Sequence, residues 1–490
     1  MTNAVVVLTV LVLYFVLLLM LSRYRSSSNT DNDAFFRAGR RSHWLMVAFG
    51  MIGASVSGVS FVSVPGWVDR TGMTYLQMCL GFFFGYLVIA FVLLPLYYSL
   101  RLTSIYDYLR QRFGSRSHIT GAAFFIVSKF LGAGARLYLA CLVLHEILCR
   151  PFGIPFPLTA VVMLCGIFIY THRSGIHSIV RTDALQTACM LLALVGMLGF
   201  AMNTLNFSLS ETWQYVVQSD MCRVFSWDWH DSQYFWRQFL SGMFITIVMT
   251  GLDQDMMQKN LTCSNLRSAQ KDMCSYGFCF LPVNLLFLLL GILLYAVAQQ
   301  SGVDVSGIRG DRLMPFLVNN GFLGQLVIIP FALGIASAAF SSADSAMTAL
   351  TTSICVDLLG IERRGCAQNR AERQRKQVHV AVLLAMWFCI VSFYVLQSDS
   401  IIDLVYVMAG YTYGPLLGLF AFGLFTKRSV RDAYIPIVAV VSPVICAVLD
   451  HFAPLWWGYH FGYELLMFNG LLTMLGCWAL TIRSRDTKSV

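Results

Sequence analysis

Charged residues are scarce in this sequence. Asp, Glu, Lys and Arg make up 12% of the 490 residues, whereas hydrophobic residues make up 57%, and the mean hydropathy is +0.67. Water-soluble domains typically carry about 25% charged residues. The longest polar stretches, 203–233, 299–320 and 360–377, are each too short for an independently folded domain. The composition therefore excludes a soluble globular protein and predicts a polytopic membrane protein embedded in a lipid bilayer.

The sequence also lacks the residue patterns of an enzyme site. None of its 14 cysteines stands in a CxxC pair or at Cys/His metal spacing, and we find no nucleophile and base pair and no phosphate-binding loop. We therefore expect no catalytic residues, and the pattern indicates no obligate protein partner. Most cysteines are interpreted as small core residues. Cys149 and Cys222 fall on the same predicted side of the membrane, where they could pair or remain free.

Apolar stretches of helix length recur along the whole chain. Each is bounded by polar or turn-forming residues, as expected of transmembrane helices. The sequence therefore predicts an all-α fold of about 13 transmembrane helices, at roughly 4–22, 45–68, 74–99, 119–147, 156–171, 180–203, 237–255, 273–298, 322–357, 378–396, 401–425, 433–450 and 461–482.

Basic residues are distributed unevenly between the loops that these spans define. With the N-terminus outside, most of the 34 Lys and Arg residues fall on inner loops, including the stretch 259–271, and on the C-terminal tail. This bias predicts a multi-pass protein of the plasma (inner) membrane with a cytoplasmic C-terminus. It also accounts for the net charge of +9 without nucleic acid. The first span has no basic segment before it and no cleavage site after it, so we expect a retained helix.

The ninth span carries small residues and hydroxyls where a lipid-facing helix would carry large apolar ones. At 3.6 residues per turn, one helical face presents the series Ala338, Ser341, Ser345, Thr348 and Thr352, with Ser342 beside it. Hydroxyl and carbonyl oxygens suit a hard cation such as Na⁺. The alternative is structural, since intramembrane hydroxyls also bond to the carbonyl four residues back and small residues allow close helix packing.

Two other spans contain glycines that would interrupt a helix. The second reads GMIGASVSGVSFVSVPG from residue 50, and the seventh has Gly242 and Gly251 before Asp253 and Asp255. An unwound second span could offer the carbonyls of Gly53 and Val56 to a cation and the hydroxyls of Ser57 and Ser60 to a solute, or it could simply pack closely. Because five spans separate the two interruptions, we predict a five-plus-five inverted repeat.

The repeat gives a division of the chain into four parts. We expect an extra N-terminal helix and the first inner loop at 1–44, the first repeat at 45–203, the second repeat with its outer loops at 204–425, and two C-terminal helices with a short inner tail at 426–490.

Several charged residues fall within or close to the predicted spans. Lys129 and Arg136, seven residues apart, share one face of the fourth span. Arg136 could hold a substrate carboxylate, and either base could instead pair with a buried acid. Asp183 could lie on an ion exit path or begin a helix, and Asp344 could ligate an ion or bond to a neighbouring helix. Asp253 and Asp255 could form a charged inner rim or bind ligands.

These features together resemble the sodium/solute symporter family, whose fold is of the LeuT type. The resemblance covers nearly the whole chain. It is carried by the motifs ASVSGVSFVSVPG (54–66), ARLYL (135–139), TDALQ (182–186), GLDQDMMQKNL (251–261), AAFSSADSAMTALTTSICVDL (338–358) and YTYGPLLGLF (411–420).

The resemblance implies a set of ligands. A main sodium site would use the carbonyls of Gly53, Val56 and Ala338 with the hydroxyls of Ser341 and Ser342. A second sodium site would use Asp183, Ser341 and Ser345. Arg136 matches a position that binds the substrate carboxylate in sialic acid members, and we add Ser57, Ser60, Gln77 and Asp253 as candidate solute contacts.

We therefore predict a sodium-coupled symporter that imports a small polar organic solute by alternating access, with Na⁺ as its coupling ion. A carboxylate-bearing solute, such as a sugar acid or an amino acid, is favoured. A sodium-independent uniporter or channel, and a non-transporting sensor with the same fold, are the alternatives. Whether one or two sodium ions bind is left open at this point.

Overall fold

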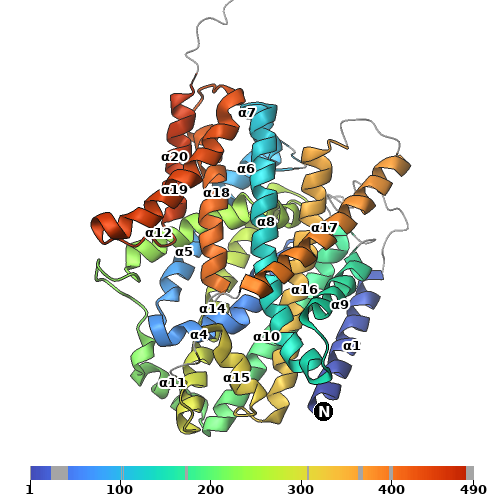
Figure 1. The fold of residues 1–490 in the computed structure, drawn as a ribbon, viewed down its shortest axis with the longest axis vertical. Helices are drawn as coiled ribbons and strands as arrows, with labels where there is room; N and C mark the ends of the chain where they lie inside the picture. Colours follow the sequence, from blue (N-terminus) through green and yellow to red (C-terminus); the bar gives the residue numbers. More distant parts are fainter. Residues whose placement is uncertain are drawn as a thin grey trace, which may run out of the picture.

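The computed structural model describes residues 2–23, 42–100, 102, 104–171, 175–305, 308, 310–361, 368–396 and 401–481. Most of the first predicted inner loop and nearly all of the C-terminal tail lie outside these residues. In the described part of the chain the structure is helical (Figure 1). The α-helices are α1 (Thr2–Arg23), α3 (Trp44–Ser55), α4 (Gly58–Thr71), α5 (Tyr75–Val88), α6 (Leu94–Ser99), α7 (Asp107–Arg112), α8 (Ser115–Leu144), α9 (Phe156–Thr171), α10 (Gly175–Leu205), α11 (Leu209–Gln218), α12 (Phe235–Thr246), α13 (Gln254–Asn260), α14 (Leu266–Gln300), α15 (Leu313–Asn319), α16 (Ile328–Ser353), α17 (Gln368–Leu396), α18 (Ile401–Phe425), α19 (Ile435–Trp457) and α20 (Leu465–Ala479).

Each predicted span has a helical counterpart. Among the described residues, nine helical segments are long and apolar enough to cross a membrane, and the bent pair α3 and α4 makes a tenth. The shorter apolar helices α9 and α20 correspond to the fifth and thirteenth predicted spans. The seventh predicted span is divided between α12, the π-helical segment η6 (Ile247–Gly251) and α13. The protein is therefore an all-α, multi-pass membrane protein, for which thirteen spans is an approximate count.

The predicted interruptions of the second and seventh spans are real breaks. Helix α3 ends at Ser55, Val56 and Ser57 are extended, and α4 leaves at an angle of 59°. In the seventh span, α12 and η6 end at Gly251, and α13 restarts at Gln254 with Asp253 as its N-cap. The Asp253 side chain accepts the backbone N–H of Asp255. Both breaks free backbone groups inside the bundle, where they need polar partners.

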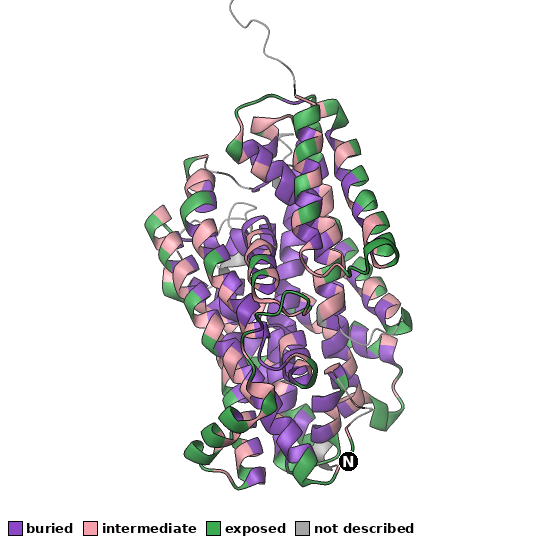
Figure 2. Cartoon of the chain, turned by 90° about the vertical axis from the view of Figure 1, so that its left-hand side faces the viewer, coloured by how far each residue is buried: buried purple, intermediate pink, exposed green. Residues whose placement is uncertain are grey.

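Helix α16 lies at the centre of the bundle. In its apolar segment 72% of the residues are buried, against 22% in α1 and α19, which lie at the periphery. Figure 2 shows buried residues through the middle of the molecule and exposed ones on the outward faces of the helices. Helix α7 lies at one end of the bundle, and α11, α15 and the N-terminus lie at the other (Figure 1). We refer to these as the α7 end and the α11 end.

Glycine allows α3 to approach α10 closely. A Cβ atom on Gly53 would lie 2.1 Å from Thr187 Oγ1, and one on Gly50 would lie 3.0 Å from Asp183 Cβ. No larger residue fits at Gly53 without displacing α10. The structural interpretation of these glycines is thus correct, and the same contact brings the broken helix beside Asp183.

Candidate functional site: a charged cavity between the broken helices

A cavity of about 100 Å³ lies between the two broken helices. It is bordered by α3, α5, α8, α12, α13, α14, α16 and α18, so both predicted repeats contribute to it. Its polar lining consists of Ser55, Tyr86, Ser128, Lys129, Arg136, Thr246, Thr250, Asp253, Asp255, Tyr276, Ser342, Tyr406 and Tyr413. A partly apolar hollow with a few converging polar groups is the usual form of a small-molecule site.

Lys129 is held by two carboxylates in this cavity. Its Nζ lies 2.7 Å from Asp255 Oδ2 and 3.1 Å from Asp253 Oδ2. Tyr413 Oη donates to Asp253 Oδ2 at 2.6 Å. All four residues are buried. Asp253 and Asp255 therefore lie inside the protein rather than on a charged rim, and Lys129 pairs with buried acids, as one of the two interpretations predicts.

Arg136 follows Lys129 by about two helical turns along α8 and lines the same cavity. Tyr406 and Tyr413 of α18 line the same cavity. Within the described part of the chain, its guanidinium has no carboxylate within ion-pair distance. The cavity therefore contains one neutralised base and one guanidinium that can still bind an anion, because a fork of N–H donors matches a carboxylate.

A pair of tyrosines separates this cavity from a second hollow. Tyr75 Oη and Tyr406 Oη are 3.1 Å apart. Tyr406 lines the main cavity, and Tyr75 lines the second hollow together with Trp67, Arg70, Thr71, Gln233, Gln238, Asp403 and Tyr463. Neither Tyr75 nor Tyr406 was among the predicted site residues, and the cavity tyrosine Tyr413 was noted only as part of the motif at 411–420. Tyrosines at membrane depth are the signal that would have drawn attention to them.

The hydroxyl face of α16 meets α3 at the cavity. Ser342 lines the cavity alongside Ala54 and Ser55 of α3. Its hydroxyl donates to the carbonyls of Ala338, at 3.0 Å, and Ala339, at 3.1 Å. Its oxygen lone pairs remain available as acceptors. The structural interpretation is therefore confirmed for Ser342, which bonds back along the helix, and its role as a sodium ligand stays a prediction.

The end of α3 supplies carbonyls close by. The Val56 N–H donates to the Ile52 carbonyl at 2.8 Å, and the helix does not continue beyond Ser55. Carbonyls in the last turn of a helix have no following helical N–H to accept from. Gly53 and Val56 belong to this turn and to the break itself, so their carbonyl oxygens have the character that a cation ligand needs.

The structure gives Asp183 a protein partner. Lys259 Nζ of α13 lies 2.7 Å from Asp183 Oδ2, and Ser341 Oγ donates to Asp183 Oδ1 at 2.8 Å. The exposed fraction is 0% for Asp183 and 1% for Lys259. The assignment of Lys259 to an inner loop is therefore wrong, because α13, which follows the break, is buried in the bundle.

Asp344 bonds across to a neighbouring helix. Tyr170 Oη of α9 donates to Asp344 Oδ2 at 3.0 Å, and Ser345 Oγ donates to Asp344 Oδ1 at 3.2 Å. Gln186 Nε2 in turn donates to Tyr170 Oη at 3.4 Å. Of the two roles considered for Asp344, the structure shows the interhelical bond. Ser345 is engaged by the same carboxylate.

Comparison with known proteins agrees with this geometry. A model of the sodium:solute symporter family matches residues 35–433. The chain belongs to this family. The symporter is 24% identical over 441 residues to the sodium/sialic acid symporter NanT of Aliivibrio fischeri, covering 86% of this chain and 83% of the relative. It is also 24% identical over 454 residues to the sodium/sialic acid symporter SiaT of Proteus mirabilis, covering 89% and 88%.

Two further likenesses extend the comparison. The rabbit (Oryctolagus cuniculus) sodium-dependent multivitamin transporter is 26% identical over 397 residues, with 79% of this chain and 61% of the relative covered. Among solved structures, the substrate-bound outward-open state of a Na⁺-coupled sialic acid symporter superposes with a TM-score of 0.80 at 20% identity, covering 96% of both chains. The fold of this symporter is thus that of a Na⁺-coupled transporter, and the protein is a transporter rather than an enzyme.

Three of the predicted solute contacts, Ser57, Ser60 and Gln77, do not border the cavity that contains Arg136. Ser57 is buried at the α3–α4 break and Ser60 lies in the first turn of α4, and neither borders the cavity. The Gln77 side chain is fully used, because its Nε2 donates to the Gln233 carbonyl at 2.9 Å and its Oε1 accepts the Ser226 N–H at 3.1 Å. Gln77 therefore fixes the loop before α12 instead of facing the cavity.

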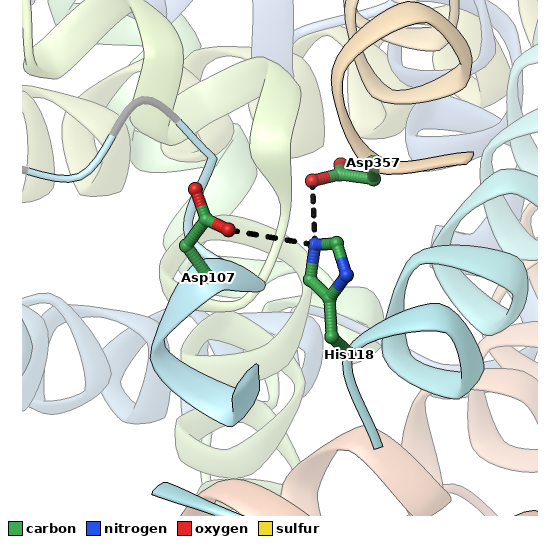
Figure 3. A group of neighbouring side chains, drawn as sticks. All are labelled: Asp107, His118 and Asp357. Atoms are coloured by element: carbon green, nitrogen blue, oxygen red, sulfur yellow. Dashed lines mark hydrogen bonds and ion pairs between the residues drawn. The ribbon is translucent and has the colours of Figure 1, made fainter. Parts of the chain in front are cut away.

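A second polar cluster of the symporter lies where α7 and α8 meet η9 (Ile354–Leu358), the π-helical segment that follows α16. Figure 3 shows His118 between Asp107 and Asp357. His118 Nε2 is 2.9 Å from Asp357 Oδ1 and 3.7 Å from Asp107 Oδ1. Ser104 and Ser353 donate to Asp357 Oδ2 at 2.9 and 2.6 Å. Because donors of the chain already satisfy this carboxylate, we interpret the cluster as a structural junction. Cys149 and Cys222 are free thiols.

Proposed function

We propose that this symporter imports a small organic solute that carries a carboxylate, and that the cavity beside Arg136 is its binding site. The observation that carries the proposal is the difference between the two bases of α8. Lys129 is neutralised by Asp253 and Asp255, whereas Arg136 lines the cavity with no acid of the described chain within ion-pair distance. Arg136 is half-buried within a membrane-spanning helix, where a guanidinium without an anion is costly, and a substrate carboxylate would supply one.

We further propose that Na⁺ binds between α3 and α16. Its ligands would be the carbonyls of Gly53, Val56 and Ala338 and the hydroxyls of Ser341 and Ser342. Two observations support this site. Helix α3 ends at Ser55, beside Gly53 and Val56. Ser342 of α16 lines the cavity that the end of α3 also borders. All these ligands are neutral oxygens, which suit a hard monovalent cation that must also be released. The second sodium site that the resemblance implies would use Asp183, Ser341 and Ser345, and the Asp183 carboxylate already accepts from Ser341 at 2.8 Å.

The proposed sodium and solute sites share a residue, which provides coupling. Ser342 is a sodium ligand in this proposal and lines the solute cavity. A sodium ion held by α3 and α16 would fix the cavity in the shape that accepts the solute, so each ligand would raise the affinity for the other. Rotation that separates the two helices would remove ligands from the ion and release it.

We place the protein in the plasma membrane, with the α11 end outside and the α7 end in the cytoplasm. The distribution of basic residues supports this orientation. The hollow lined by Arg70 would then be the outer access route, and Tyr75 and Tyr406 would lie between it and the cavity. We retain 45–203 and 204–425 as the two repeats, flanked by 1–44 and 426–490.

Uptake into proteoliposomes tests the proposal. We would use radiolabelled sialic acid, a short monocarboxylate and a neutral hexose, each with an inward gradient of either Na⁺ or K⁺. We expect uptake of at least one acid, driven by Na⁺ only, and none of the hexose. Equal uptake with both salts would contradict sodium coupling and favour a uniporter. Preference for the hexose would contradict the role of Arg136.

A further inference from the structure

An arginine without an acidic partner borders the second hollow, which we call the outer hollow and which has a volume of about 170 Å³. Arg70 lies in the last turn of α4, and its side chain is exposed. Among the residues that the structure describes, no carboxylate lies within ion-pair distance of its guanidinium. The outer hollow therefore presents a free fork of N–H donors, the arrangement that matches a carboxylate.

Two other arginines on the same predicted side of the membrane are paired. Arg223 lies 3.5 Å from Asp231, and Arg237 lies 2.7 Å from Glu464. Neither arginine lines the outer hollow. A base in the last turn of a helix is favoured by the helix dipole, so Arg70 could serve α4 alone. That role does not account for its position at the edge of a hollow bordered by aromatic rings.

Aromatic side chains connect the outer hollow with the cavity. Trp67 and Tyr75 border the hollow with their ring centroids 5.5 Å apart. Tyr463 also borders it and packs on Tyr406, with ring centroids 5.1 Å apart. Tyr406 in turn lines the cavity that contains Arg136. The two spaces are therefore neighbours, with the Tyr75–Tyr406 hydrogen bond between them and one guanidinium without an acidic partner in each.

The outer hollow also contains an acid. Asp403 borders it together with Arg70, and its carboxylate accepts the hydroxyl of Tyr463. A guanidinium attracts an incoming carboxylate, whereas an acid repels it, so these two side chains should change the rate of entry in opposite directions. A purely structural role of Arg70 in α4 predicts no such opposition.

We propose that the outer hollow is a capture site for organic carboxylates, in which Arg70 binds the anion before it passes the Tyr75–Tyr406 pair and reaches Arg136. This inference rests on the proposed function, since it takes Arg136 as the final ligand and the α11 end as the outer side. Arg70 contacts the solute only during entry and exit. It therefore changes the rates of binding and release by the same factor and leaves the equilibrium affinity of the cavity unchanged.

Rapid-mixing measurements on the purified protein in NaCl test the inference, with sialic acid and lactate as probes. Choline chloride raises the ionic strength while the sodium concentration is held constant. For a probe that wild type binds, Arg70→Gln should lower the association and dissociation rate constants about three- to tenfold at low ionic strength, with the same Kd. High ionic strength should remove this difference, because salt screens exposed charges. Asp403→Asn should raise the association rate constant.

Each result has a distinct meaning. An unchanged association rate constant in Arg70→Gln would overturn the inference, and so would a raised Kd, which would place Arg70 in the final site. The control is Arg223→Gln, which makes the same change of charge outside the hollow and should behave as wild type. An equal loss in this control would also overturn the inference. If Arg70→Gln fails to fold, an association rate constant that Asp403→Asn does not raise has the same meaning. A wild type that binds neither acid would instead contradict the proposed function.

Discussion

Lys129 Nζ lies 2.7 Å from Asp255 Oδ2, inside the cavity that also contains Arg136. The contact crosses from α8 to the restart of the broken seventh span. It assigns different tasks to two bases on one helix face. Lys129 joins the broken helix to α8, whereas Arg136 lines the cavity without an acid of the described residues within ion-pair distance, which is why we propose it as the residue that binds the substrate anion.

Removing Lys129 should destabilise the protein, and removing its partner as well should restore part of the loss. Lys129→Met leaves Asp253 and Asp255 buried without a counter-charge, which costs about 3–5 kcal/mol. Lys129→Met with Asp255→Asn leaves one carboxylate, which Tyr413 still supports. Thermal unfolding in detergent measures both variants. A double variant that is less stable than Lys129→Met would contradict the pairing.

Arg136 should determine the apparent affinity for the solute. Arg136→Ala removes charge-assisted hydrogen bonds worth about 1.5–3 kcal/mol, which predicts a KM for the acid raised about 10- to 100-fold. Arg136→Lys keeps the charge but loses the planar fork, so its loss should be intermediate. Initial uptake rates at varied solute concentration provide the measurement. An unchanged KM in Arg136→Ala would remove this residue from the site.

The approach of α3 to α10 should tolerate no side chain at Gly53. Gly53→Ala would place a Cβ 2.1 Å from Thr187 Oγ1, and overpacking of this kind typically costs about 1–3 kcal/mol. The matched control is Gly199→Ala in α10, where a Cβ meets nothing within 4 Å. Melting temperatures should fall for Gly53→Ala and stay level or rise for Gly199→Ala. Equal melting temperatures for the two variants would contradict this packing.

Much of the fold was predictable because the bilayer constrains it strongly. The length of the apolar stretches predicted the positions of the spans, and the glycines within two of them predicted the helix breaks at Val56 and Gly251. The pairing of charges was not predictable in the same way. Lys259 follows the second break by only a few residues, so a linear reading placed it in a loop. Its burial depends on the direction in which α13 leaves the break, which hydropathy does not encode.

The site was predictable in part for a related reason. Helical periodicity placed Ser341 and Ser342 on a polar face of α16, and the structure shows Ser342 at the cavity. Periodicity within one helix says nothing about partners on another. Gln77 therefore looked available to a solute, whereas a loop more than a hundred residues later in the chain occupies its amide.

Asp311, in the 3-10 helical segment η7 (Gly310–Arg312) before α15, should make stability depend on pH. Burial raises the pKa of this carboxyl to about 6, and the nearby charge of Asp403 adds to the effect. The folded protein therefore binds the proton more tightly than the unfolded chain, so stability is highest at low pH. It should fall by up to about 3 kcal/mol as the pH rises from about 4 to 7.

The variant Asp311→Asn isolates this effect. Its amide oxygen can still accept the Ile401 N–H, which Asp311 Oδ2 accepts at 2.8 Å in the native protein. Thermal unfolding across this pH range should show a flatter profile for the variant than for wild type. Identical profiles would show that Asp311 keeps an ordinary pKa.

The most direct test of the central claim compares the melting temperature of the purified protein in NaCl and in KCl at equal ionic strength. A ligand that binds only the folded state stabilises it by about 2.7 kcal/mol at one hundred times its Kd. We predict a sodium-specific rise of several degrees in wild type that Ser342→Ala loses. Ser392→Ala, which removes a similar hydroxyl bond to the carbonyl four residues back, should keep it. The same melting temperature in both salts for wild type would contradict a sodium site between α3 and α16.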